Sequence, residues 1–250
     1  MSCMDENIAI GLVGASGTLG SALRNLLPQV KVLNRDPDIS VLKSHIDVTF
    51  ICAPSGLKWY ANMYPEQDYH QLQKLIELLN KVDTDRLVLF STIDTIGSEY
   101  GGPNYYGYHR RILEKYVLND RAGSVIRLGA LLAPFINKNF LNDMKKNNVP
   151  YLPNSESRFQ FSNLFILDAF IEQIISNKFR LFNYFSEPLK VDCFLRELQC
   201  VNYEYCVNNN NKIIEYNIKN TNDNIILDSF NKVANSRGAC VAGIREYLEG

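Results

Sequence analysis

Residues 13–20 read Val-Gly-Ala-Ser-Gly-Thr-Leu-Gly and follow directly on the apolar run of residues 8–12. The run predicts a buried strand, and residues 18–27 have the spacing of an amphipathic helix. Glycine at every third position allows a tight turn, lets backbone N–H groups approach phosphates, and lets the helix pack against the strand. The segment therefore predicts a turn that binds the pyrophosphate of a dinucleotide, the alternative being a glycine-rich turn without a ligand. The residues expected at that ligand are Gly14, Ser16, Gly17, Thr18, Leu19 and Gly20.

The composition argues against several classes of partner. The chain has 250 residues, a formal net charge of −1 and scattered basic residues, so no nucleic-acid partner is expected. No apolar stretch approaches the ~20 residues of a membrane span. The first residues lack the basic and apolar regions of a signal peptide. We therefore expect a cytoplasmic protein without a membrane partner.

The cysteines and histidines give no sign of a metal site. The six cysteines contain no Cys-x-x-Cys pair, and the three histidines are dispersed along the chain. We expect reduced thiols and no bound metal.

Strand-like and helix-like segments alternate through the first half of the chain, which predicts an α/β fold built on a doubly wound parallel sheet. A small C-terminal region is expected to cap the substrate. The domains expected are a dinucleotide-binding domain over residues 1–134 and a substrate-facing region over residues 135–250, interleaved with the sheet. The expected strands are residues 8–13, 30–34, 48–53, 86–91, 124–128 and 181–185, with a short strand at 158–162 and a hairpin of 203–207 and 212–218. The expected helices are residues 18–27, 39–44, 65–81, 105–119, 141–146, 164–176, 191–198 and 241–248.

The end of the second strand bears on the choice of cofactor. Ligands of open parallel sheets bind beyond the carboxyl ends of the strands, where an acidic residue binds the ribose of NAD and an arginine accommodates the extra phosphate of NADP. Here Asn34 stands in the acidic position and Arg35 follows it. The pair favours NADP. The alternative is NAD, with Asp36 at the ribose and Arg35 on the surface.

A further strand end and a helix start supply candidate catalytic residues. Thr92 ends the strand of residues 86–91, where its hydroxyl can reach a carbonyl oxygen. Tyr106 and Arg110 open the helix of residues 105–119 and share one face. A fixed cation beside a phenol lowers the pKa of the phenol, which prepares it to exchange a proton with a substrate oxygen. The alternative is that Tyr106 only packs against its neighbours.

The loop after the third strand is expected near the cofactor and the substrate. Its residues Ala53 and Pro54 are candidates for cofactor contact. Ser55, Lys58 and Trp59 are candidates for substrate contact, although Trp59 could equally anchor the loop in the core. In the second half, Arg158 is the candidate for a substrate phosphate, the alternative being a solvated surface residue.

Taken together, four motifs resemble the extended short-chain dehydrogenase/reductases. They are the glycine turn, Ser91-Thr92, Tyr106-Gly107-x-x-Arg110 and Ile126-Arg127-Leu128-Gly129. The closest likeness is to the NAD-dependent epimerase/dehydratase family of the dTDP-4-dehydrorhamnose reductase type, over residues 8–135. The resemblance implies a Rossmann fold, a Ser/Thr–Tyr–Lys catalytic set and a nucleotide-linked sugar substrate, and it admits a homodimer.

The resemblance implies roles for the candidate residues. Thr92 would orient the substrate oxygen, Tyr106 would be the acid/base, and Arg110 would take the place of the family's lysine. That exchange is not conservative, since the guanidinium is planar and bulkier than an ammonium. The function expected is reduction of a nucleotide-linked keto-sugar with NADP(H). The alternatives are an epimerase or dehydratase on the same fold, for which Asp94 is a candidate, and a regulatory NADP-binding protein without catalysis.

Overall fold

The computed structural model describes residues 8–34, 44–96, 104–136, 139–198, 206–219, 222 and 224–249. It divides into two compact units. The first consists of Met1–Arg127 and Ile175–Phe182, and the second of Leu128–Ile174 and Asn183–Gly250. Within the described residues, no helix has the length and apolar character needed to cross a membrane.

A six-stranded parallel sheet with the order β2-β1-β3-β4-β5-β9 forms the centre of the fold. The chain runs from β1 outward to β2, then returns to the other side of β1 for β3, so the direction of strand addition reverses between β1 and β3. Ligands of such sheets bind at this reversal. The predicted α/β class with a Rossmann-like sheet is confirmed. The strands are β1 Ile10–Val13, β2 Lys31–Leu33, β3 Ile46–Ile51, β4 Thr84–Thr92, β5 Ser124–Leu128 and β9 Leu181–Tyr184.

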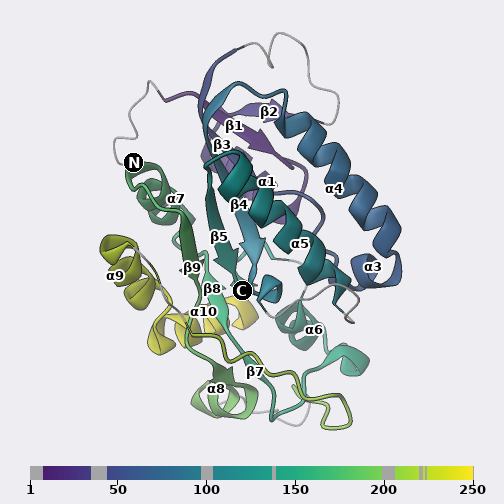
Figure 1. Ribbon diagram of the computed structural model, residues 1–250. Coiled ribbons are helices and arrows are strands. Elements are labelled where there is room, and N and C mark those ends of the chain that lie inside the picture. The colour runs from purple at the N-terminus through teal and green to yellow at the C-terminus, as the bar shows by residue number, and fades with distance from the viewer. Residues whose placement is uncertain are drawn as a thin grey trace. The chain divides into compact units, whose positions relative to one another are not determined.

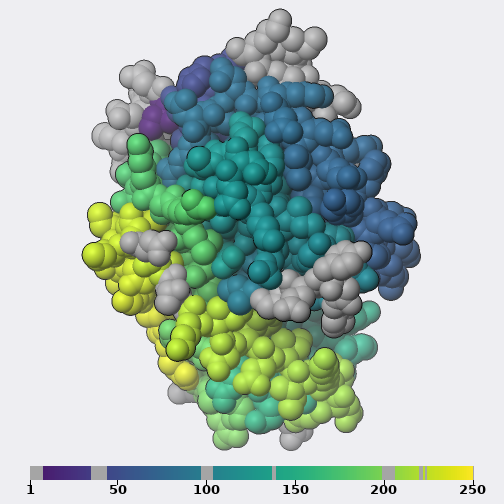
Figure 2. Space-filling model, in the orientation of Figure 1, coloured from purple at the N-terminus to yellow at the C-terminus, as the bar shows by residue number. Residues whose placement is uncertain are grey.

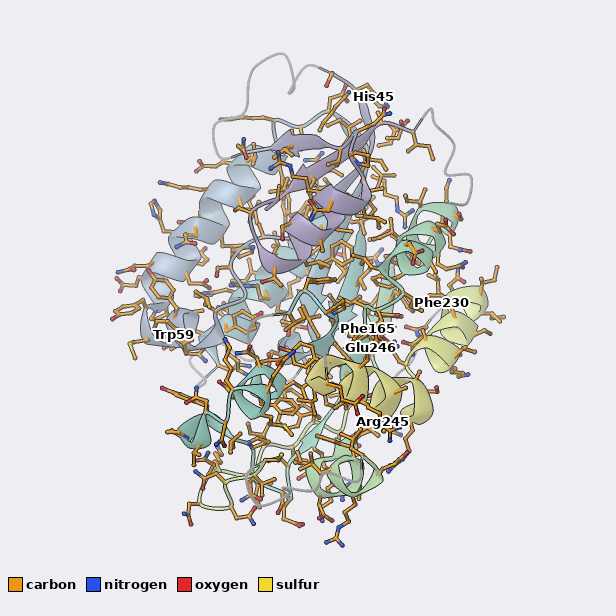
Figure 3. The ribbon with its side chains drawn as sticks, turned by 180° about the vertical axis from the view of Figure 1, so that it is seen from behind. His45, Trp59, Phe165, Phe230, Arg245 and Glu246 are labelled. Atoms are coloured by element: carbon orange, nitrogen blue, oxygen red, sulfur yellow. The ribbon has the colours of Figure 1, made fainter. Side chains whose placement is uncertain are left out.

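Helices cover both faces of the sheet in the first unit. Figures 1 and 3, which are opposite views, show α4 and α5 side by side over one face and α1 over the other. Leucines of α4 and α5 pack with buried residues of β3 and β4 into one apolar core. Pro65 stands in the first turn of α4, where a missing N–H costs nothing. These helices are α1 Thr18–Leu26, α3 Lys58–Met63, α4 Pro65–Leu79 and α5 Tyr105–Lys115, which continues as a π-helical turn over Tyr116–Asp120.

The second unit holds two small sheets and most of the remaining helices. One sheet pairs β6 (Ala130–Leu132) with β8 (Phe161–Asn163), and the other pairs β7 (Arg158–Phe159) with β10 (Leu189–Lys190). The single strand predicted for residues 158–162 is therefore two strands in different sheets. The helices are α6 Phe140–Lys145, α7 Leu167–Ser176, α8 Val191–Glu197, α9 Ile225–Ala234 and α10 Arg237–Glu249.

The hairpin predicted after residue 202 is wrong in its second arm, and residues 203–205 lie outside the described part of the chain. Described residues 212–218 form no strand beyond an isolated bridge, in which backbone groups of Ile214 and Tyr216 bond with those of Arg158. Polar side chains bind other backbone groups of this segment. Ser157 Oγ accepts from the N–H of Ile214. Gln160 accepts from the N–H of Ile218 and donates to its carbonyl oxygen. The helix predicted at residues 39–44 falls almost wholly outside the described residues.

Candidate functional site

The glycine turn follows β1 at the carboxyl edge of the sheet. Gly14 has a φ of +85°, and a Cβ at this position would lie 2.7 Å from the carbonyl oxygen of Cys52. A side chain is thus excluded both by the left-handed backbone and by the neighbouring strand end. A Cβ on Gly20 would lie 2.0 Å from the carbonyl oxygen of Gly14. The first turn of α1 therefore packs directly on the loop before it.

Gly17 differs from Gly14 and Gly20, because a Cβ at this position would make only ordinary contacts. It is the N-cap of α1, and the nearest atom to an added Cβ would be the Gly14 carbonyl oxygen at 3.4 Å. No side chain caps α1, and its first turn carries no acidic residue. Ser16 and Gly17 are exposed. The turn thus presents backbone N–H groups at the positive end of a helix, which is the arrangement that binds a phosphate. Leu19 is buried, so it can meet a ligand only through its backbone.

The ends of β2 and β3 lie beside this turn in the sheet. Asn34 is exposed directly after β2, whereas Arg35 and Asp36 lie outside the described residues. The prediction that Arg35 binds a phosphate therefore stays a prediction. The backbone nitrogen of Ala53 would be 3.2 Å from a Cβ on Gly14, so the structure brings Ala53 and the glycine turn together. Burial raises the pKa of the neighbouring Cys52 thiol.

At the carboxyl end of β4, the Thr92 side chain lies close enough to Tyr106 to lower the pKa of its phenol. Three contacts fix the start of α5 at this place. Asn104 caps the helix by accepting from the N–H of Gly107 at 3.0 Å, and it donates to the carbonyl oxygen of Asp94 at 3.2 Å. The N–H of Tyr106 donates to Asn62 Oδ1 of α3 at 3.0 Å. The helix start is thus attached to two other segments of the first unit.

The pKa of Tyr106 is raised, contrary to the lowering expected from Arg110 alone. Burial is the main cause, and the Asp94 charge acts in the same direction. Arg110, Lys58 and the nearby Thr92 side chain lower the pKa, but they do not outweigh the loss of solvent around the phenol.

Arg110 is almost completely buried, and its hydrogen bonds go to protein groups. Its two terminal nitrogens donate to the two carboxylate oxygens of Asp68 at 2.8 and 3.0 Å, and one also donates to the carbonyl oxygen of Ser55 at 2.6 Å. The guanidinium lies over the Tyr106 ring, 4.5 Å from its centroid. Arg110 therefore lies over the face of the Tyr106 ring and is hydrogen-bonded to the loop after β3. The expected role of holding a ribose gains no support from these contacts.

Asp68 also binds His109, whose Nδ1 lies 2.7 Å from Asp68 Oδ2 in the same buried cluster. Burial opposes ionisation of this carboxyl. The hydrogen bonds and charges of His109 and Arg110 prevail, so the pKa of Asp68 is lowered. Sequence reasoning placed Asp68 only within the helix expected at residues 65–81 and missed this role. The available signal was its position one turn into a helix that begins with Pro65.

The loop after β3 holds the remaining candidates of the first unit. Lys58 Nζ lies 2.6 Å from Asp94 Oδ1. Trp59 is 61% exposed and touches the Tyr60 ring edge-on, so it does not anchor the loop in the core. Figure 3 labels Trp59 on α3, and Figure 2 shows the blue α3–α4 segment at the surface. Arg158 belongs to the second unit, where it lies exposed on β7.

Comparison with known proteins gives matches among solved structures. A scan of protein-family models finds no match, and neither does a search of curated proteins. A UDP-N-acetylglucosamine 4-epimerase from Methanobrevibacter ruminantium, in complex with UDP-N-acetylmuramic acid, is 13% identical with a TM-score of 0.70, over 97% of each chain. A protein in complex with UDP-glucose and NAD is 16% identical with a TM-score of 0.64, over 96% of this chain and 97% of that one.

A hypothetical dTDP-4-dehydrorhamnose reductase from Sulfolobus tokodaii is 18% identical with a TM-score of 0.58, over 85% of this chain and 87% of that one. The structure of RMD from Pseudomonas aeruginosa complexed with NADPH also matches, at 13% identity with a TM-score of 0.63, over 96% of this chain and 99% of that one. At these identities the likeness establishes the fold. The chain therefore has the Rossmann-like fold of these epimerase and reductase structures, which is the fold implied by its sequence resemblance to the epimerase/dehydratase family.

Proposed function

We propose that the chain is an NAD(P)-dependent oxidoreductase that reduces a nucleotide-linked keto-sugar. The observation that carries this proposal is the pair of Thr92 and Tyr106, whose side chains lie close enough that the threonine hydroxyl lowers the pKa of the phenol. It lies at the carboxyl edge of the same sheet whose β1 leads into the glycine turn. A threonine hydroxyl and a phenol at that edge, beside a turn suited to phosphates, are the parts that carbonyl reduction needs.

The glycine turn fits the pyrophosphate of a dinucleotide. The open space at Gly17 and the uncapped start of α1 support this assignment, because a Cβ or a side-chain cap would fill the place of a phosphate oxygen. Ser16 and Thr18 flank that space, and Asn34, Arg35, Ala53 and Pro54 are the other proposed contacts. When bound, a nicotinamide dinucleotide supplies the hydride. NADP(H) is the proposed form, with NAD(H) as the alternative.

Tyr106 acts as the acid in the proposed reduction. Since burial raises its pKa, the phenol keeps its proton at neutral pH and can donate it to the oxygen of a carbonyl that is being reduced. Thr92 orients the same oxygen through its hydroxyl. Arg110 positions both the Tyr106 ring and the loop at Ser55.

The proposed substrate is a sugar attached to a nucleoside diphosphate. Two of the matching structures hold a UDP-sugar, namely UDP-N-acetylmuramic acid and UDP-glucose. The exposed residues Ser55 and Trp59, together with Lys58 and Arg158, are the proposed contacts. A homodimer through α4 and α5 also stays a proposal, and sedimentation equilibrium of the purified chain tests it.

An epimerase or dehydratase is the second candidate, and one observation favours it. Asp94 Oδ2 lies 3.3 Å from the Thr92 hydroxyl, so a carboxylate is available beside the threonine as a further acid or base. Conversion of a nucleotide sugar without net consumption of NADPH is the result that this candidate predicts.

The test uses the purified chain, NADPH fluorescence and a panel of nucleotide-linked 4-keto-sugars. Tyr106→Phe should bind NADPH like the wild type and lose about 10²- to 10⁴-fold in turnover. The control Tyr105→Phe removes a phenol from the same helical turn and should keep its activity. Binding without turnover across the panel would favour a regulatory dinucleotide-binding protein.

Arg35→Ala tests the cofactor preference. It should weaken the binding of NADP(H) and leave the binding of NAD(H) nearly unchanged.

A further inference from the structure

The carboxylate of Glu114 is buried near the end of α5, among hydrogen-bond donors from three other segments. Ser91 of β4 donates its hydroxyl to Glu114 Oε1 at 2.6 Å, and the Thr95 hydroxyl lies 3.0 Å from the same oxygen. Arg127 of β5 binds both oxygens, with Nη2 2.6 Å from Oε2 and Nε 3.0 Å from Oε1. All four residues belong to the first unit. The cation and the two hydroxyls offset the cost of burying this charge.

Two of these donors lie on either side of Thr92 in the sequence. Ser91 directly precedes Thr92, which ends β4 in an extended conformation and caps the short turn Ile93–Thr95 with its side chain. The Thr95 hydroxyl is 3.0 Å from the carbonyl oxygen of Thr92 as well as 3.0 Å from Glu114, so its single hydrogen is shared between them. Glu114 therefore fixes the chain both before and after Thr92.

The helix that carries Glu114 also carries Tyr106. Tyr106, Arg110 and Glu114 are four residues apart in α5 and lie on one helical face. Figure 1 shows α5 beside β4. Since α5 is a continuous helix between the two residues, the spacing from the Glu114 backbone to the Tyr106 backbone is set by the helix itself. A movement of the strand end relative to Tyr106 thus requires that the hydrogen bonds at Glu114 break.

We propose that Glu114 is a positioning residue that fixes Thr92 relative to Tyr106, because it binds the strand end of the first to the helix of the second. Arg127 neutralises the carboxylate and orients both of its oxygens. The inference rests on the proposed function for the use that a reaction makes of Thr92 and Tyr106. The attachment of the strand end to α5 is independent of any cofactor or substrate.

The first test measures this attachment by amide hydrogen exchange with NMR detection, without cofactor or substrate. The N–H of Asp94 donates to Thr92 Oγ1 at 3.2 Å, and the N–H of Ile96 donates to the carbonyl oxygen of Ile93 at 3.1 Å. These two amides report on the turn that follows β4. Thr95→Val removes the shared hydroxyl and nearly keeps the shape of the side chain. Both amides should then exchange about five- to tenfold faster, as for the loss of one hydrogen bond.

Thr84→Val is the matched control. Thr84 begins β4, so this variant removes a hydroxyl from the opposite end of the same strand and should leave both amides unchanged. Glu114→Gln is the second variant, and it should accelerate both amides in the same direction as Thr95→Val. Thr95→Val keeps the ion pair of Glu114 with Arg127, so it remains informative if Glu114→Gln does not fold.

The second test separates positioning of Thr92 from general support of the fold. Thr95→Val should lower kcat for keto-sugar reduction by about tenfold and leave the Kd of NADPH unchanged. In a Thr92→Val background the hydroxyl that is positioned is already gone, so Thr95→Val should lower kcat by less than about twofold further.

Equal losses of kcat in the two backgrounds would overturn the proposal, because Thr95 and Glu114 would then act on the fold as a whole. Unchanged exchange of both amides in Thr95→Val would also overturn it. Absence of turnover in the wild-type chain would contradict the proposed function, and the amide exchange would still decide whether Glu114 fixes the strand end.

Discussion

Arg110 and Asp68 form a bidentate ion pair in the interior of the first unit, with nitrogen–oxygen distances of 2.8 and 3.0 Å. The pair joins the first turn of α4 to α5, and through Ser55 it reaches the loop after β3. An arginine binds the two carboxylate oxygens of Asp68 with separate nitrogens while it also reaches Ser55, whereas the single nitrogen of a lysine cannot form such a bidentate pair. The arginine at this position is therefore part of the framework that holds Tyr106.

Asp68→Asn should destabilise the chain by about 3 kcal/mol, because it leaves Arg110 buried without a counter-charge. Urea unfolding followed by circular dichroism measures the change. Folding lowers the pKa of Asp68 below its ordinary value of 3.8. Its contribution is therefore complete above that value and lost as the pH falls through the folded-state pKa. The exposed Glu66 of the same helical turn provides the control, and Glu66→Gln should change stability by no more than about 0.5 kcal/mol.

Gly20→Ala should prevent normal packing of α1 on the glycine turn, since its Cβ would lie 2.0 Å from the Gly14 carbonyl oxygen. Unfolding at lower urea concentration and loss of NADPH binding are both expected. Gly238 of α10 is the matched control, because an added Cβ there meets nothing within 4 Å. Gly238→Ala should stabilise the chain by about 0.5–1 kcal/mol through helix propensity. Equal effects of the two substitutions would contradict this account of Gly20.

The proposed reduction should keep its rate across neutral pH and decline only in strongly alkaline solution. Tyr106 must be protonated to act as the acid, and its pKa is raised above 10.0 by burial. The pH profile of kcat/KM for reduction measures this directly. A decline that begins near neutral pH would show that another group supplies the proton.

His45 should titrate above 6.5 in the folded chain. Asp85 and Asp83 raise its pKa, although partial loss of solvent opposes them, and its ring nitrogens lie 3.3 and 3.5 Å from their carboxylates. Proton NMR of the imidazole measures the value, and Asp85→Asn should lower it. A raised folded-state pKa means that the contribution to stability is present below the unfolded-state pKa and lost as the pH rises through the folded-state value. Figure 3 shows His45 far from Trp59, so the effect is separate from the candidate site.

The sequence predicted those elements of the fold that are determined by residues close together in the chain. The glycine turn, Pro65 at the start of α4 and the strand Ser124–Leu128 are signalled by residues close together in sequence. The meeting of Thr92 and Tyr106 also follows from topology, because each residue sits where an element reaches the carboxyl edge of the sheet. The cluster around Asp68 did not follow, since a carboxylate in a first helical turn is ordinarily solvated and its partners lie more than 40 residues away.

The second half of the chain was harder to predict for a different reason. Asparagine and glutamine side chains bind backbone groups there, as Asn154 does with the carbonyl oxygens of Asn209 and Asn211. Such bonds replace a strand ladder and leave no periodicity in the sequence. Helix α9 was missed although it is regular, and its apolar residues Ile225, Ile226 and Val233 are exposed instead of forming a buried stripe.

The hydrogen bond from the Tyr106 N–H to Asn62 connects α3 directly to the candidate site. One end of this short helix carries Lys58 and the exposed Trp59, and the other carries the amide that holds the Tyr106 backbone. The substrate contact proposed for Trp59 therefore belongs to the same six-residue helix as the Asn62 contact to Tyr106. A tilt of α3 would move the Lys58 ammonium, which contacts Asp94, and the Tyr106 backbone together.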